Sequence, residues 1–275
     1  MSDLSDLSCS FGEQSERVRY FPRQLITADD MRAEQEYFRE KARRHNRYLH
    51  GWGVVCGCTV EAVTLNQGKQ GNHGNQGWQV RVCPGYAVDP QGDDILIDSC
   101  ITVDLQVGAQ QQPCSVRWPC PPAGEMPGIN QERGSTVYVA VRYAECFSRP
   151  TRVHPGGCGC DEIGCEYTRI RDSFEIKVLW ELPASHLQAR KDDEQWCRTV
   201  QALTPEALQR RHALPVPPCP PCPTDPWVVL ATVYIPPANS GPSANGNNNS
   251  LQITTDDCRV LLATQRIQVA SVCLP

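Results

Sequence analysis

The sequence predicts a mainly β protein with a long N-terminal helix: an antiparallel β-sandwich or barrel-like core with short helices added, an α+β arrangement. Three observations support this fold class. The chain of 275 residues contains 23 prolines and 20 glycines, which is typical of many short strands joined by turns. Apolar and β-branched residues alternate in several runs after residue 53, and a helical pattern precedes them.

Composition divides the chain into three parts. Residues 1–19 are polar and predict an N-terminal arm, and residues 20–181 predict the helix and the β core. Residues 182–275 predict a helical and proline-rich connector followed by C-terminal strands, and these strands are candidates for a second small β domain.

The helix is predicted from "TADDMRAEQEYFREKARRHNRYLHG". Thr27 is an N-cap candidate with Asp30 three residues on, and Gly51 is the stop signal, so the helix is about 23 residues and about 35 Å long. The basic run over 39–47 is interspersed with glutamates and predicts a solvated helix face. One apolar stripe is expected to contain Met31, Phe38, Ala42, His45 and Leu49.

A change of structure is predicted at Gly51-Trp52-Gly53, where the glycines end the helix and start a sheet. Trp52 is expected to pack under this junction. Cys56 and Cys58 stand two residues apart on the strand that follows, so both are expected on one face, packed into the core.

The remaining strands are predicted from alternating runs that turn signals separate. The acidic turn with Asp89, Asp93 and Asp94 lacks the glycine and terminal glutamate of a calcium loop and is expected to be solvated. Helices are expected in "ARKDDEQWCRTVQAL" and "TPEALQRRHAL". The predicted strands lie in "WQVRV", "CPGYAVDPQGDDILI", "ITVDLQV", "STVYVAVRYAEC", "RIRDSFEIKVLWELP" and "WVVLATVYIP".

Charge and hydropathy exclude several classes of protein. A formal charge of −5 without a basic cluster argues against nucleic-acid binding. The sequence has neither a signal-peptide pattern nor an apolar run long enough to span a bilayer, so synthesis in the cytoplasm is expected. In that compartment the 16 cysteines are expected to be buried hydrophobic residues or metal ligands rather than disulfides. The alternative is that some of these cysteines are oxidised to disulfides after particles are released by cell lysis.

Zinc is the one candidate cofactor. His154, Cys158, Cys160 and Cys165 lie within twelve residues and could close a tetrahedral site, although the Cys158–Cys160 spacing is shorter than usual. The alternative is a glycine-rich loop whose thiols pack locally or form an adventitious disulfide. A second weak metal candidate is the CxxC pair Cys219 and Cys222 on a proline-rich segment.

Catalytic motifs are missing from the sequence. It contains no G-x-S-x-G, P-loop, H-E-x-x-H or G-x-G-x-x-G motif, so no enzyme activity is expected. His45 and His50 are five residues apart, which should keep them off a common α-helical face. His45 is instead expected to be a hydrogen-bonded interface residue.

Four blocks of the chain resemble one protein family: "YFPRQLITADDMRAEQEYFREKARRHNRYLHGWGVVCGCTV", "VCPGYAVDPQGDDILI", "YVAVRYAEC" and "CEYTRIRDSFEIKVL". The family consists of structural proteins encoded in the gene clusters of phage-tail-like extracellular contractile injection systems. Cys58 departs from it, since an aliphatic residue is usual there. The resemblance implies a baseplate or tail-associated component that contacts baseplate, sheath or tube proteins and forms a homo-oligomer within the particle.

The leading functional hypothesis is therefore a structural subunit that is made in the cytoplasm and assembled into a particle, with membrane association or release by lysis as later fates. One alternative is a β-sandwich adhesion module that binds a cell-surface glycan or a membrane-associated partner through loops 66–77 and 236–250. Another is a structural zinc protein or a zinc- or thiol-dependent enzyme. The interface is predicted to contain Tyr20, Phe21, Met31, Phe38, His45, Leu49 and Trp52.

Overall fold

Ten strands and two α-helices form the part of the chain that the structure, a computed structural model, describes. This part comprises residues 16–63, 78–105, 134–153, 164–202, 219, 225–237 and 251–258. Every strand pairing within it is antiparallel. The predicted mainly β, antiparallel, α+β class is therefore confirmed.

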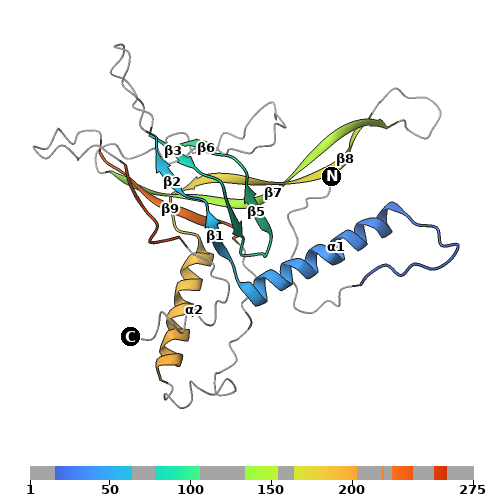
Figure 1. Ribbon diagram of the computed structural model, residues 1–275, viewed down its shortest axis with the longest axis horizontal. Helices are drawn as coiled ribbons and strands as arrows, with labels where there is room; N and C mark the ends of the chain where they lie inside the picture. The colour runs from blue at the N-terminus through green and yellow to red at the C-terminus, as the bar shows by residue number, and fades with distance from the viewer. Residues whose placement is uncertain are drawn as a thin grey trace, which may run out of the picture.

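The strands form three sheets, one of four strands and two of three strands. In the four-stranded sheet, β9 lies between β7 and β10, so the predicted C-terminal strands join the sheet that the long β7–β8 hairpin begins (Figure 1). The sheets, in strand order, are β1 (Gly53–Gly57), β4 (Gly85–Val88) and β5 (Asp94–Ile97); β2 (Val60–Ala62), β3 (Gln79–Val82) and β6 (Ile101–Asp104); and β10 (Gln252–Thr254), β9 (Val228–Ile235), β7 (Ser135–Val153) and β8 (Gly164–Leu179).

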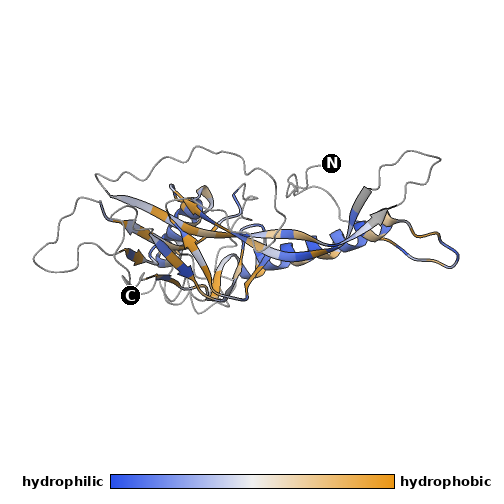
Figure 2. Cartoon of the chain, turned by 90° about the horizontal axis from the view of Figure 1, so that it is seen from above, coloured by the Kyte–Doolittle hydropathy of each residue, from blue (hydrophilic) through white to orange (hydrophobic). Residues whose placement is uncertain are grey.

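One hydrophobic core unites the three sheets. Strands of both small sheets contact the large one, as β1 does with β9, β2 with β10 and β5 with β8. Many of the hydrophobic residues, coloured orange in Figure 2, lie on the strands of this layered region. Its fully buried large side chains include Val80, Val82, Ile95, Ile97, Val103, Leu105, Val137, Val139, Ile176, Leu230 and Ile235.

The β7–β8 hairpin extends beyond that core. Its pairing runs from Tyr138 opposite Leu179 to Val153 opposite Gly164. Phe174 and Ile176 are buried near its base, whereas Phe147, Tyr167 and Ile170 are exposed farther out. Phe147 and Tyr167 stack across the hairpin with ring centroids 5.8 Å apart. Cross-strand side-chain pairs of this kind contribute to the stability of the outer half.

Strand β1 ends in a reversal that the sequence did not predict. Gly57 and Cys58 have φ angles of 64° and 54°, and the register against β4 shifts between Val54 and Cys56. Because positive φ interrupts the alternation of a strand, Cys58 is buried while Cys56 is exposed. The expectation that both thiols share one face was wrong, and only Cys58 packs in the core.

The helices also differ from the prediction of one long helix with short ones. Helix α1 (Ala28–His45) ends before Gly51 and continues as a π-helical turn, η1 (Asn46–His50). Helix α2 (Ala184–Gln201) starts five residues before the predicted segment. It is 18 residues long, which is also the length of α1. Neither helix combines the length and apolar character needed to cross a membrane, as far as the described residues extend.

Candidate interaction surface

Helix α1 starts at the predicted cap. The Thr27 side chain accepts a hydrogen bond from the backbone N–H of Asp30, and the Asp30 carboxylate accepts one from the Thr27 N–H at 2.8 Å. This reciprocal capping box satisfies two backbone donors at the helix start. It also stabilises the charged form of Asp30, because the backbone and side-chain hydrogen bonds from Thr27 lower the pKa of that carboxyl.

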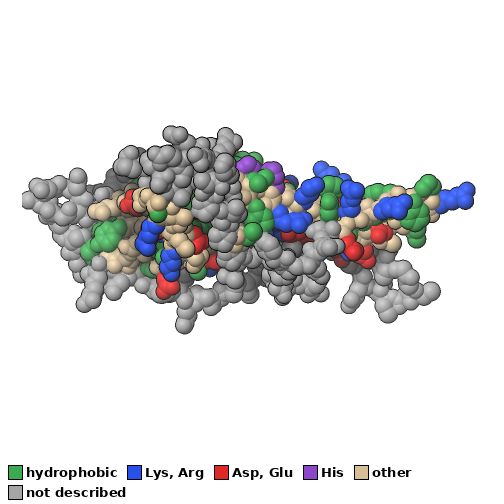
Figure 3. All heavy atoms as spheres, turned by 90° about the horizontal axis from the view of Figure 1, so that it is seen from below, with side chains coloured by type: hydrophobic (Ala, Val, Ile, Leu, Met, Phe, Trp, Pro, Cys, Tyr) green, Lys and Arg blue, Asp and Glu red, His purple; other side chains and the backbone are tan. Residues whose placement is uncertain are grey.

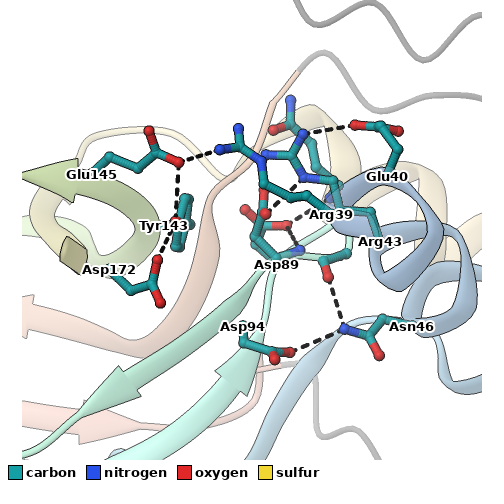
Figure 4. Close-up of polar contacts among 12 residues, drawn as sticks. Arg39, Glu40, Arg43, Asn46, Asp89, Asp94, Tyr143, Glu145 and Asp172 are labelled. Carbon is teal, nitrogen blue, oxygen red and sulfur yellow. Dashed lines mark hydrogen bonds and ion pairs between the residues drawn. The ribbon is translucent and has the colours of Figure 1, made fainter. Parts of the chain in front are cut away.

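The side of α1 that contacts the β core is charged. Arg43 is buried, with 8% of its surface exposed, and its Nε donates to Oδ1 of Asp93 at 2.7 Å. Its Nη1 also donates to Glu40 at 2.8 Å. Burial alone would lower the pKa of Arg43, but the two carboxylates raise it above the ordinary value. The guanidinium is therefore held charged inside the contact (Figure 4).

Arg43 contacts the turn between β4 and β5. Asp89 Oδ1 accepts backbone N–H bonds from Gln91 and Asp93, each at 2.9 Å. Gly92 has φ 97°, and a Cβ placed there would lie 2.3 Å from the Arg43 carbonyl oxygen. Glycine thus permits both the backbone conformation and the close approach of the helix. Asn46 completes the contact by donating to the Gly92 carbonyl oxygen and to Asp94, at 2.9 and 3.0 Å.

A second polar contact ties α1 to the large sheet. Arg39 pairs with Glu145 on β7. Glu145 also accepts from the Tyr143 hydroxyl at 3.2 Å, and that hydroxyl lies 2.7 Å from Asp172 on β8 (Figure 4). We name these contacts the helix anchor: Arg39, Arg43 and Asn46 on the helical segment with Asp93, Asp94 and Glu145 on the sheets.

The acidic turn and the basic run were both predicted to be solvated, and these predictions were wrong at three positions. Asp89 and Asp93 are 1% and 7% exposed, and Arg43 is buried against them. The local sequence could not reveal this, since Arg43 and Asp93 are 50 residues apart. The feature of the sequence that could have indicated this contact is the opposite charge of the basic run and the acidic turn.

The apolar side of α1 faces outward. Phe38 and Leu49 are 56% and 66% exposed, and Met31 is 49% exposed. Helix α1 projects away from the core, as the β7–β8 hairpin does (Figure 1). Seen from below, hydrophobic and basic side chains alternate along this projection (Figure 3). The predicted stripe therefore exists, and in the isolated chain it is uncovered at these positions.

The segment before α1 adds to this apolar surface. Tyr20 hydrogen-bonds to Glu34, which holds the segment beside the helix. Phe21, Leu25 and Ile26 are all exposed, Leu25 to 85%. Of the predicted N-terminal arm, residues 1–15 lie outside the described residues. We define the outward face as Tyr20, Phe21, Leu25, Ile26, Met31, Phe38 and Leu49.

His45 and His50 lie together, contrary to the prediction. Their Nε2 atoms are 3.3 Å apart and their ring centroids 5.1 Å apart. The π-helical turn is the reason, because a π helix repeats at i, i+5 and so brings residues five apart onto one face. Both side chains are exposed at the end of the outward face.

Trp52 has a different environment from the other predicted interface residues. It is half-buried against the core, and its ring meets His186 of α2 edge-on with centroids 4.7 Å apart. His186 Nε2 in turn accepts the backbone N–H of Val229 at 3.1 Å. Trp52 thus packs under the junction as expected, and it connects the helix end to α2.

The cysteines divide into bonded and free ones. Cys146 and Cys197 are disulfide-bonded, which contradicts the expectation of reduced thiols at these two positions. Burial raises the pKa of Cys58, with the neighbouring thiols Cys56 and Cys258 adding to it, to about 12. The free cysteines of the described residues are Cys56, Cys58, Cys83, Cys100, Cys219 and Cys258.

Most of the predicted zinc ligands lie outside the described residues. His154, Cys158, Cys160 and Cys222 fall outside the described residues, Cys165 is placed only as backbone in β8, and Cys219 is exposed. Within the described residues, no three His, Cys, Asp or Glu side chains are grouped to hold a metal ion. Zinc at the 154–165 loop stays a prediction.

The loops that the adhesion alternative requires, 66–77 and 236–250, lie outside the described residues except for 236 and 237. That alternative also stays a hypothesis. Comparison of the whole chain with protein-family models and with curated proteins finds no match.

Proposed function

We propose that this chain is a non-catalytic structural subunit of a phage-tail-like contractile injection particle, and that the outward face of α1 is one of its docking surfaces. The proposal combines the sequence resemblance with the placement of α1. Its partners would be baseplate, sheath or tube subunits and further copies of the chain. It would be made in the cytoplasm and then incorporated into the particle.

The observation that carries the proposal is the reversed attachment of α1. An amphipathic helix normally buries its apolar side and leaves its charges in water. Here the charged side, through Arg43 and Arg39, contacts the protein's own sheets, and Met31, Phe38 and Leu49 face away from them. We base the docking surface on these exposed apolar side chains because large exposed apolar patches mark interaction sites.

The composition of the outward face indicates what would bind it. Exposed Lys41 and Arg44 lie on the same helix as Phe38, and Leu49 follows in η1. The complementary partner would offer an apolar groove with acidic residues at its rim, since opposite charge at the rim steers association while apolar burial supplies affinity. Helix α1 is about 27 Å long, which is sufficient to span such a groove.

The test replaces the apolar side chains of the outward face without touching the helix anchor. In a tagged chain expressed with its native neighbours, Met31→Gln, Phe38→Ser and Leu49→Ser should together reduce recovery of the chain in purified particles by tenfold or more. A matched control is Val55→Ser, Leu96→Ser and Leu187→Ser, which removes exposed apolar side chains elsewhere.

Two measurements separate docking from folding. Far-UV circular dichroism and thermal unfolding should be nearly the same for both triple variants, because all six side chains are exposed. If the α1 variant enters particles as efficiently as the control, the outward face is not a docking surface. If the unmodified chain is never found in particles, the proposed function itself is wrong.

A further inference from the structure

Cys83 and Cys100 form a pair that the strand register places face to face. Strand β3 pairs with β6 from Gln79 opposite Asp104 to Val82 opposite Ile101. The next residues in the same register are Cys83 and Cys100. Both are free thiols, and their side chains are in hydrogen-bonding contact.

The backbone hydrogen bonds define the geometry of this pair. The N–H of Cys83 donates to the Thr59 carbonyl oxygen at 2.8 Å, so the backbone polar groups of Cys83 point toward β2 rather than β6. Cys83 and Cys100 are therefore a non-hydrogen-bonded antiparallel pair, for which the Cα atoms are about 4.5 Å apart. This separation lies within the range that a disulfide requires.

The pair is accessible from solvent. Val80 and Val82 of β3 point into the core, so the alternating positions Arg81 and Cys83 lie on the opposite, outer face. Cys100 is exposed. A small oxidant can reach these thiols, whereas Cys58 is buried.

We propose that Cys83 and Cys100 are a disulfide-forming site, oxidised by thiol–disulfide exchange with a low-molecular-weight disulfide such as oxidised glutathione. One thiolate attacks the glutathione disulfide and releases one reduced glutathione. The second protein thiolate then attacks the mixed disulfide and releases another. Two protein thiols lose two protons and two electrons, and one glutathione disulfide is reduced to two thiols.

The position of the cross-link gives it a consequence for the helix anchor. The 83–100 segment contains β4, β5 and the turn with Asp89, Gly92 and Asp93 that receives Arg43. A bond between its two ends closes the base of this β4–β5 unit. Oxidation would thus restrict the surface that holds α1, in addition to lowering the conformational freedom of the unfolded chain.

The direct test is peptide mapping of the unmodified full-length chain. The protein is reduced, then incubated under native conditions with a mixture of oxidised and reduced glutathione, and its remaining thiols are blocked with iodoacetamide. Digestion with trypsin and an Asp-specific protease separates residues 82–88 from residues 98–103, each with a single cysteine. We expect these two peptides to be recovered joined, and separated after reduction.

Alkylated Cys83 and Cys100, glutathione on either residue, or either thiol joined to a different cysteine would overturn the proposal. The linked peptides would support it even if the assembly role proposed above were wrong, because this test does not involve the particle.

A second measurement uses variants. Oxidation should raise the midpoint of thermal unfolding of the unmodified chain by roughly 5–10 °C more than that of Cys83→Ser/Cys100→Ser, given the length of the closed loop. Cys56→Ser, which removes another exposed thiol, should retain the full increase. An equal increase in the double variant would contradict a stabilising cross-link at this site.

Discussion

Helices α1 and α2 have the same length and are both attached by polar side chains, but the attachment of α2 also includes an aromatic contact. In the first turn of α2, the buried His186 contacts the Trp52 ring and accepts a backbone N–H from β9. The last turns of α1 are attached through Arg43 and Asn46 to an acidic turn. We infer that α1 is positioned by specific polar contacts, which leave its apolar side chains for other contacts.

The largest effect is expected from breaking the helix anchor. Arg43→Met should destabilise the protein by about 3–5 kcal/mol, because Asp93 remains buried without its cationic partner. Urea unfolding monitors the global change, and hydrogen exchange of the α1 amides monitors release of the helix. The exposed Lys41→Met on the same helix is the control and should change stability by less than about 0.5 kcal/mol.

The double variant Arg43→Met/Asp93→Leu refines this test. Replacing both charges by apolar side chains removes the unpaired carboxylate, so most of the lost stability should return. A single Arg43→Met variant with unchanged stability would mean that the anchor does not hold α1.

The next largest effect is expected on the pH dependence of stability, through Asp89 in the turn that contacts α1. Burial, followed by the nearby charge of Asp93, raises the pKa of Asp89 to about 7, although three backbone hydrogen bonds oppose this. Since the folded-state pKa lies above the unfolded value near 4, Asp89 contributes stability that is present below pH 4 and lost as the pH rises through 7.

Asp89→Asn should remove that contribution, because the amide oxygen can still accept the backbone N–H bonds. The free energy of unfolding of the variant, relative to that of the unmodified protein, should increase by on the order of 2–4 kcal/mol from pH 4 to pH 8. Chemical denaturation at several pH values measures the difference. A difference that does not vary with pH would mean that Asp89 is ionised throughout.

A smaller effect is expected at the attachment of α2. His186→Ala removes the acceptor of the Val229 N–H and the edge-on contact of Trp52, at a cost of about 1–3 kcal/mol. Tryptophan fluorescence should change along with the denaturation midpoint. His186→Gln keeps an acceptor and should recover part of the loss, whereas equal losses in both variants would assign the effect to the ring alone.

The smallest effect belongs to the start of α1. Thr27→Ala removes one half of the capping box and should cost about 0.5–2 kcal/mol of helix stability. Hydrogen exchange is expected to accelerate in the first turns of α1 only, with α2 as the internal reference. A uniform change over both helices would instead indicate global destabilisation.

Local sequence patterns predicted the fold class, the cap at Thr27 and the apolar stripe of α1, because each depends on residues within one or two turns or strands. The direction in which that stripe faces could not be predicted. It depends on Arg43 meeting Asp93 across 50 residues, and the basic run and the acidic turn each look solvated when considered alone. The pairing of His45 with His50 required a π-helical turn, which no local signal indicated.

The π-helical turn at Asn46–His50 has a consequence for insertions and deletions. The Gly51 N–H donates to the carbonyl oxygen of Asn46, five residues earlier, so this turn holds one residue more than an α-helical turn would. The side chain at position 46 is constrained there, because Asn46 belongs to the helix anchor. Removing one residue from 47–49 should therefore convert the turn to α-helix and leave the two histidines four residues apart, a spacing that still shares one helical face.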